Sequence, residues 1–432
     1  MRRAACLRTD VSQSRISPAV ALARDLLITA LGFCLPYWAI TSYEFHVVSY
    51  RDALSLAMLV VGSALVLTHG AVSDRRHVPP RWITLAWLGF FLLGLASAWR
   101  AEHADAAFSQ LRLYFSVVVL GYGFRLWLDQ PTRRTLVGLM LAFCLAHGLI
   151  LILIIGYATG WVSDPLARDP TAVPYHGNIR HVAYHGMLSA CCGLVIFAAG
   201  GPSRLLGLAL AALSIFGLVF LGQRGGLGGL LAFLAIAAIL PLRMKGSIVV
   251  ASLVMVFAAF LTTHALEYLG VVNRITGSLV ERSGSAGVEI AYDTSGRREI
   301  WVASLKESLR SPLLGLGPDG YRFSSARSSN AVAIQPHSAL IQALLEFGVL
   351  GLIVLSYFVF RVGAIGLRLA ISNRMSDTGD VGKLLWATCG GFLAYSLVDG
   401  LFYHPVGLLV FTMLSTLTFA ALADDQDHLP PG

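Results

Sequence analysis

The chain has 432 residues, of which 56% are hydrophobic and 13% charged, with a mean hydropathy of +0.70 and a formal net charge of +8. A soluble domain carries about 25% charged residues. This chain therefore cannot cover its surface with polar groups, and much of that surface must face lipid. The composition excludes a soluble enzyme and predicts an all-α polytopic membrane protein.

About twelve apolar segments are long enough to cross a bilayer. They begin near Leu26, Ala53, Trp82, Leu113, Thr135, Val182, Leu205, Gly225, Ser247, Ser338, Leu384 and Val406. The first follows a basic N-terminus without a small-x-small cleavage site, so we interpret it as a retained span. The predicted layout is 1–25 for a cytoplasmic N-terminus, 26–270 for nine spans, 271–337 for one large external loop subdomain, 338–423 for three spans and 424–432 for a cytoplasmic tail.

Basic residues in the short loops are about three times as frequent on the N-terminal side as on the other, which predicts that both termini are cytoplasmic. The positive charge therefore reports topology rather than binding to nucleic acid. None of the cysteines lies in the long external loop, so no disulfide framework is expected.

The long loop contains RREIWVASLKESLR, which predicts an amphipathic helix because Trp301, Leu305 and Leu309 repeat at helical spacing. The simplest interpretation is a helix that lies at the membrane interface and caps the bundle. The following LLGLGPDGYRF has three glycines and a proline and predicts a turn-rich segment.

Three arginines near predicted span or helix starts are candidates for binding an anion on the outer side: Arg180, Arg224 and Arg297. A helix N-terminus offers free N–H groups, and a guanidinium adds a planar fork suited to phosphate. The alternative for each is an arginine that extends to the membrane interface. Arg298 and Gln335 are secondary candidates.

His337 follows Pro336 at the start of the tenth predicted span. The positive end of the helix dipole disfavours imidazolium there, so the neutral, proton-accepting form of a general base is expected. A packed interfacial histidine is the alternative. Asp399 is an acid inside the eleventh span near its outer end, which makes it a candidate functional residue by default. A role as the counter-ion of an arginine or histidine is the interpretation that we favour.

The external loops contain no D-x-D or E-x-D pair of the kind that holds a divalent cation in metal-dependent lipid-linked glycosyl transferases. Arginines, rather than a metal ion, are therefore expected to stabilise negative charge in any transfer reaction. No metal site and no cofactor are predicted. The role of Asp319 is left open by the sequence.

The succession of SGRREIW, LLGLGPDGYRF and PHSALIQALLEFGVLGL resembles the signature region of bacterial O-antigen ligases and O-antigen polymerases. His337, Ser338 and Gly348 fit the family run that opens a span. The family glutamine falls at Gln342, one place late, and serine stands where asparagine is commoner. The signature covers 295–352, and the layout of spans extends the resemblance over nearly the whole chain.

This resemblance implies a GT-C-like glycosyltransferase of the bacterial inner membrane with its active site facing the periplasm. It implies transfer of O-antigen glycan from undecaprenyl pyrophosphate to the terminal sugar of lipid A-core, with inversion and without a metal. His337 would be the base, and Arg180, Arg224 and Arg297 would bind the pyrophosphate. An O-antigen polymerase and a protein O-oligosaccharyltransferase are the near alternatives. A transporter of lipid-linked glycan is more distant, because the ionisable residues gather at one face rather than at the midplane.

Overall fold

The computed structural model describes residues 50–70, 81–128, 133–158, 179–269, 297–327, 335–372 and 377–424, with a few helical residues between 22 and 34. The secondary structure of these residues is entirely helical, as the composition predicted. The helices are α2 (Tyr50–Gly70), α3 (Arg81–Arg100), α4 (Ala104–Trp127), α5 (Arg133–Ala158), α6 (Ile179–Ala199), α7 (Arg204–Phe220), α8 (Arg224–Ile239), α9 (Lys245–Tyr268), α12 (Arg297–Ser308), η2 (Gly320–Phe323), α13 (Ala339–Ser372), α14 (Asp377–Ser396) and α15 (Pro405–Asp424).

Most of these helices coincide with predicted spans. The starts agree closely except in α4 and α14, which begin several residues earlier than predicted, and the span near Leu26 falls largely outside the described residues. Among the described residues, 5 helical segments suit a membrane crossing by length and composition: Trp82–Arg100, Arg133–Gly156, Val182–Ala199, Lys245–Leu266 and Ala339–Ile371. Shorter apolar segments lie in α2, α7, α8 and α15. The protein therefore has the character of a polytopic membrane protein, while the count of twelve and the periplasmic side of the loop stay predictions.

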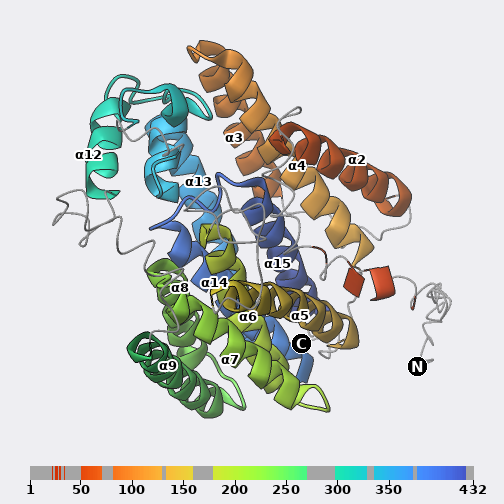
Figure 1. The fold of residues 1–432 in the computed structure, drawn as a ribbon. Helices are drawn as coiled ribbons and strands as arrows, with labels where there is room; N and C mark the ends of the chain where they lie inside the picture. The colour runs from red at the N-terminus through yellow and green to blue at the C-terminus, as the bar shows by residue number, and fades with distance from the viewer. Residues whose placement is uncertain are drawn as a thin grey trace, which may run out of the picture.

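Helix α14 lies in the middle of the structure. It packs against α5, α6, α8, α13 and α15, and its apolar side chains belong to the largest buried cluster. Figure 1 shows α14 and α15 at the centre, with α2 to α4, α5 to α9 and α12 placed around them. The residues that follow α14 are therefore held among several helices.

Facing glycines bring three helix pairs into backbone contact. The pairs are Gly62 with Gly123, Gly193 with Gly207, and Gly229 with Gly391. A Cβ added to Gly391 would lie 2.6 Å from the carbonyl oxygen of Gly229 on α8. Small residues at such crossings allow close helix packing where lipid gives no hydrophobic driving force between helices. The last pair fixes α8 directly against α14.

Helix α13 is broken at Gly348, which has φ of 66° and ψ of −169°. The break frees backbone groups that an intact helix would use, and the glycine-rich loop after α12 satisfies them. The N–H of Leu316 donates to the carbonyl of Leu345 at 2.8 Å, and the N–H of Val349 donates to the carbonyl of Pro312 at 2.9 Å. Buried backbone groups require such partners.

Glycine is required on both sides of this contact. A Cβ on Gly348 would lie 2.4 Å from the backbone of Leu313, and a Cβ on Gly315 would lie 2.4 Å from the backbone of Glu346. The positive φ of each residue adds a second reason for glycine. The LLGLGPDG motif is therefore the segment that fills the break in α13. This contact explains why the motif occurs together with PHSALIQALLEFGVLGL, which contains Gly348.

Candidate active site

His337 is held in an unusual backbone conformation just before α13. Its φ is 54°, in the left-handed region that few non-glycine residues adopt, and it is 4% exposed. The helix begins two residues later, at Ala339, so His337 precedes the helix rather than opening it as expected. Strained conformations of this kind persist only where surrounding contacts impose them.

One of those contacts comes from α12. The indole N–H of Trp301 donates to the carbonyl of Pro336 at 2.9 Å. The tryptophan of the predicted loop helix thus fixes the peptide that precedes His337. Helix α12 occupies Arg297–Ser308, close to the prediction from the sequence.

Asp399 pairs with His337. Its Oδ1 lies 3.5 Å from Nδ1 of His337 and accepts a hydrogen bond of 2.8 Å from the N–H of Gly400. Asp399 is 4% exposed and stands three residues beyond the end of α14, rather than inside the span. This is the position expected of a counter-ion to His337.

Arg297 approaches the other oxygen of the same carboxylate. Its Nη2 lies 3.8 Å from Oδ2 of Asp399, and its Nη1 donates to the carbonyl of Val398. The guanidinium has five N–H donors, and its Nε has no hydrogen-bond partner among the described residues. The base candidate and one arginine candidate therefore share a single carboxylate.

Gln335 and His404 form the second side of this group. The Nε2 atoms of Gln335 and His404 are 2.9 Å apart. Gln335 is 1% exposed, and a Cβ on Gly400 would lie 1.1 Å from its Oε1. Gly400 must therefore lack a side chain for Gln335 to occupy this place.

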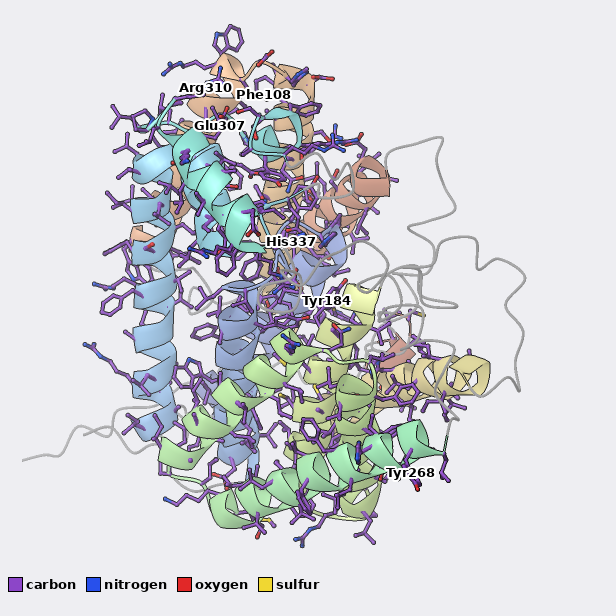
Figure 2. The ribbon with its side chains drawn as sticks, turned by 60° about the vertical axis from the view of Figure 1, so that its left-hand side comes forward. Phe108, Tyr184, Tyr268, Glu307, Arg310 and His337 are labelled. Atoms are coloured by element: carbon purple, nitrogen blue, oxygen red, sulfur yellow. The ribbon has the colours of Figure 1, made fainter. Side chains whose placement is uncertain are left out.

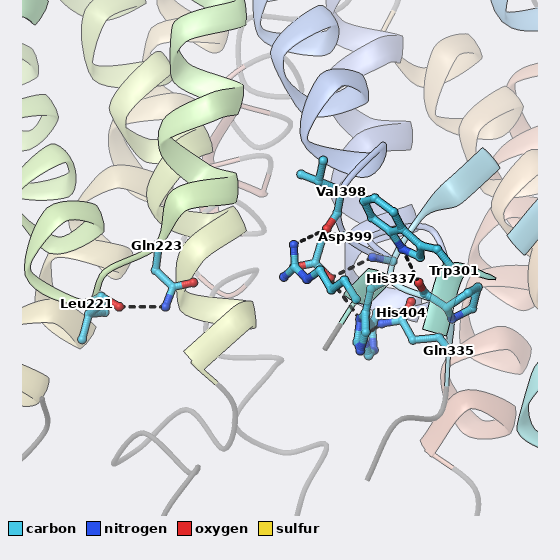
Figure 3. Close-up of polar contacts among 11 residues, drawn as sticks. Leu221, Gln223, Trp301, Gln335, His337, Val398, Asp399 and His404 are labelled. Atoms are coloured by element: carbon cyan, nitrogen blue, oxygen red, sulfur yellow. Dashed lines mark hydrogen bonds and ion pairs between the residues drawn. The ribbon is translucent and has the colours of Figure 1, made fainter. Parts of the chain in front are cut away.

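The cluster is visible as a single group in Figure 3, which draws His337, Asp399, Trp301, Gln335 and His404 together and Gln223 apart from them. It is assembled from the segment before α13, the start of α12 and the segment between α14 and α15. Of the predicted residues, the structure brings together His337, Arg297 and Gln335.

The other two arginines predicted to bind the anion, Arg224 and Arg180, lie on α8 and α6. Arg224 is the first residue of α8 and is exposed. A Cβ on Gly225 would lie 2.3 Å from the ring of Tyr395, so α8 begins beside the end of α14 that leads to Asp399. Arg298 is exposed on α12, and the side chain of Arg180, in the first turn of α6, lies outside the described residues.

Three residues of this region had no role assigned from the sequence. The hydroxyl of Tyr403 donates to Oδ1 of Asp319 at 2.8 Å, which links the loop after α12 to the segment that carries His404. Asp319 is fully buried and has φ of 63°. His404 directly precedes Pro405, the first residue of α15, and a histidine beside a helix start is the signal that could have identified it.

Among the described ranges, no group of three or more His, Cys, Asp and Glu side chains could hold a metal ion. The polar groups of the cluster are two imidazoles, one carboxylate, one amide and a guanidinium. Such a set can accept a proton and neutralise an anion.

The chain was compared with known proteins. Residues 187–356 match the family model described as O-antigen ligase, and this range includes Arg224, Arg297 and His337 but not Arg180 or Asp399. No curated protein matches the chain. Members of the matched family are glycosyltransferase-like ligases and polymerases that act on lipid-linked glycans. Residues 187–356 are therefore similar to the O-antigen ligase family over the part of the chain that contains Arg297 and His337.

Proposed function

We propose that the protein transfers O-antigen glycan from undecaprenyl pyrophosphate to the terminal sugar of lipid A-core at the periplasmic face of the inner membrane. The observation that carries the proposal is the sharing of Asp399 by His337 and Arg297 inside a chain that is similar to this family over 187–356. A proton acceptor and a fixed positive charge are the two groups that the reaction requires.

His337 acts as the general base. Asp399 faces Nδ1, so the proton of neutral imidazole belongs on Nδ1 and Nε2 is left to accept a proton. The acceptor hydroxyl gives its proton to Nε2 as its oxygen forms a bond to the anomeric carbon. Asp399 then stabilises the imidazolium that results. Positioned bases of this kind contribute about 10²–10⁴-fold to rate.

Arginine stabilises the leaving group. The bond between the anomeric carbon and the pyrophosphate oxygen breaks, and its electron pair leaves with the undecaprenyl pyrophosphate. Arg297 retains N–H donors beyond those used by Asp399 and Val398, and they can receive this charge. Arg224 and Arg180 are the further pyrophosphate ligands. A single displacement by the activated hydroxyl inverts the anomeric configuration.

The surrounding residues position these groups. Trp301 fixes the peptide before His337, and the side chain of Gln335 contacts the ring of His404. We expect the 3.5 Å contact between His337 and Asp399 to shorten when substrate closes the site, as is common for catalytic hydrogen bonds. The apolar helices hold the polyprenyl and acyl chains.

Reconstitution tests this function. The purified protein is placed in proteoliposomes with undecaprenyl-pyrophosphate-linked glycan and lipid A-core, with and without EDTA. Ligated product that forms equally in both conditions is expected. Failure with lipid A-core, together with elongation of a lipid-linked glycan, would identify a polymerase instead. Product that forms only with added divalent metal would contradict the role given to the arginines.

A further inference from the structure

The amphipathic helix α12 has its polar face turned inward. Its buried side chains are mainly polar: Ser304 (0% exposed), Glu307 (7%) and Ser308 (6%), with Ile300 (8%) beside them. Its outward face is apolar: Val302 (45% exposed), Leu305 (45%) and Leu309 (74%). These three residues recur at spacings of three and four, which places them on one stripe of the helix. A helix that capped a water-facing subdomain would show the opposite arrangement.

Two of the inward polar side chains, Glu307 and Ser308, are paired, whereas the hydroxyl of Ser304 has no hydrogen-bond partner among the described residues. The carboxylate of Glu307 accepts hydrogen bonds from Ser325 at 2.5 Å and from Arg310 at 2.6 Å. The hydroxyl of Ser308 donates to the carbonyl of Leu305 at 2.8 Å. These hydrogen bonds on the buried face fix the orientation of α12, so Leu305 and Leu309 point outward. An apolar stripe fixed in this way requires an apolar partner.

The stripe continues onto a helix that is long and apolar enough to cross a membrane. After α12, the carbonyl of Leu313 accepts a hydrogen bond from the N–H of Leu350 on α13 at 3.3 Å. Leu313, Leu350 and Ile353 are 63%, 40% and 58% exposed. Figure 2 shows α12 alongside α13, with Glu307 and Arg310 at one end and His337 beside the other. The apolar face of α12 thus joins the side of α13 that would meet lipid.

Two basic residues accompany the stripe. Arg298 lies one turn before Val302, Lys306 lies one turn after it, and both are exposed. The exposed acid Glu299 lies farther round the helix, while Glu307 is neutralised by Arg310. An apolar stripe with Arg at one end and Lys at its side is typical of helices that bind the interface of an anionic membrane.

We propose that the outward face of α12, formed by Arg298, Val302, Leu305, Lys306 and Leu309, is a docking surface for membrane lipid with anionic, phosphate-bearing headgroups. This surface is independent of the transfer reaction itself. Because Trp301 on the same helix holds Pro336, lipid bound there lies one helix away from His337. The apolar stripe takes the acyl chains, and the two cations take the headgroups.

Site-specific fluorescence in nanodiscs tests this surface. Leu305→Cys carries an environment-sensitive fluorophore, and Glu299→Cys, exposed on the same helix about 120° round from Leu305, is the matched control. Cys6 and Cys34 are first replaced by serine, since Cys34 is exposed and the cysteines Cys144, Cys191, Cys192 and Cys389 are buried. Quenching is measured with nitroxide-labelled lipid and with aqueous iodide. At position 305 we expect at least threefold stronger quenching by lipid than at position 299, and the reverse order with iodide.

Headgroup preference is measured in nanodiscs of phosphatidylcholine with or without phosphatidylglycerol. Lipid quenching at position 305 is expected to rise with phosphatidylglycerol, and Lys306→Gln is expected to remove much of that rise. Equal iodide quenching at positions 305 and 299 would overturn the proposal. Shielding from iodide without quenching by lipid would also overturn it, because protein rather than lipid would then cover the face. A signal unaffected by phosphatidylglycerol would overturn the anionic preference.

Discussion

The Nδ1 atom of His337 lies 3.5 Å from Oδ1 of Asp399, although the two residues come from segments that are far apart in the chain. The same carboxylate meets Arg297 through its second oxygen. Asp399 therefore couples the base that would accept a proton to the cation that would receive the leaving group. Its position between the two makes it the residue on which the proposed chemistry depends most after His337.

Replacing the shared carboxylate should impair transfer. In Asp399→Asn, the amide no longer stabilises imidazolium and no longer pairs with Arg297, so we expect the transfer rate to fall by about 10²-fold or more. The rate is measured with reconstituted protein that elutes at the wild-type position. Asp105→Asn, which changes an exposed acid elsewhere, is the control and should keep the wild-type rate. A normal rate in Asp399→Asn would reduce the carboxylate to a packing role.

A methyl group at Gly400 should displace Gln335. The Cβ of Gly400→Ala would lie 1.1 Å from Oε1 of Gln335, so the amide must move away from His404. Overpacking of this kind costs about 1–3 kcal/mol, and we expect a lower thermal unfolding midpoint together with slower transfer.

Two further variants decide whether that clash is the cause. Gln335→Ala in the Gly400→Ala background makes room for the methyl group and should recover much of the lost stability. Gly89→Ala, where nothing lies within 4 Å of the added Cβ, should leave the midpoint nearly unchanged. Failure of the double variant to recover stability would place the strain elsewhere.

Arg224→Lys should weaken binding of the lipid-linked donor. A lysine keeps the positive charge but lacks the planar fork that grips two phosphate oxygens, so we expect KM for the donor to rise about tenfold. Arg204, which also begins a helix, supplies the control variant Arg204→Lys. Donor KM that is unaltered in Arg224→Lys would mean that this arginine only extends to the membrane interface.

The attachment of α12 should weaken in acid. Burial alone would raise the pKa of Glu307, but hydrogen bonds from Ser325 and Arg310 and the charge of Arg310 together hold the pKa below its usual value of 4.5. A group with a depressed folded pKa stabilises the fold above its unfolded pKa and loses that contribution as pH falls through the folded pKa.

Comparison with Glu307→Gln isolates this effect. At neutral pH we expect the wild type to be more stable by about 1 kcal/mol, since the exposure of Arg310 screens part of the interaction. The difference in thermal midpoint should shrink as pH drops below 4.5 and vanish below the folded pKa. A difference that stays constant with pH would show that the charge of Glu307 is unimportant.

Local sequence features predicted much of this structure. Apolar length and composition located helices from α2 to α15, and the periodicity of Trp301 and Leu305 located α12. His337 and Arg297 stood out because charged or titratable groups beside apolar runs are rare. Asp399 was recognised as a counter-ion for the same reason, without its partner being known.

The remaining features depend on tertiary contacts. The pairing of Asp399 with His337 joins distant segments, and no local periodicity encodes it. The break at Gly348 follows from hydrogen bonds to the loop after α12, although the residues around it read as one continuous apolar span. The outward orientation of Leu305 was likewise hidden, because the same stripe is compatible with either face inward. For His404, the position beside Pro405 is the one local signal, and it is too weak to assign the residue a role.

The transfer rate of His337→Ala, measured with purified lipid-linked glycan and lipid A-core, tests the proposed mechanism most sharply. His337→Ala should insert and elute like the wild type while ligated product falls by at least about 10²-fold. Ligation at the wild-type rate in that variant would contradict the assignment of His337 as the base, and with it the central role of the His337–Asp399–Arg297 group.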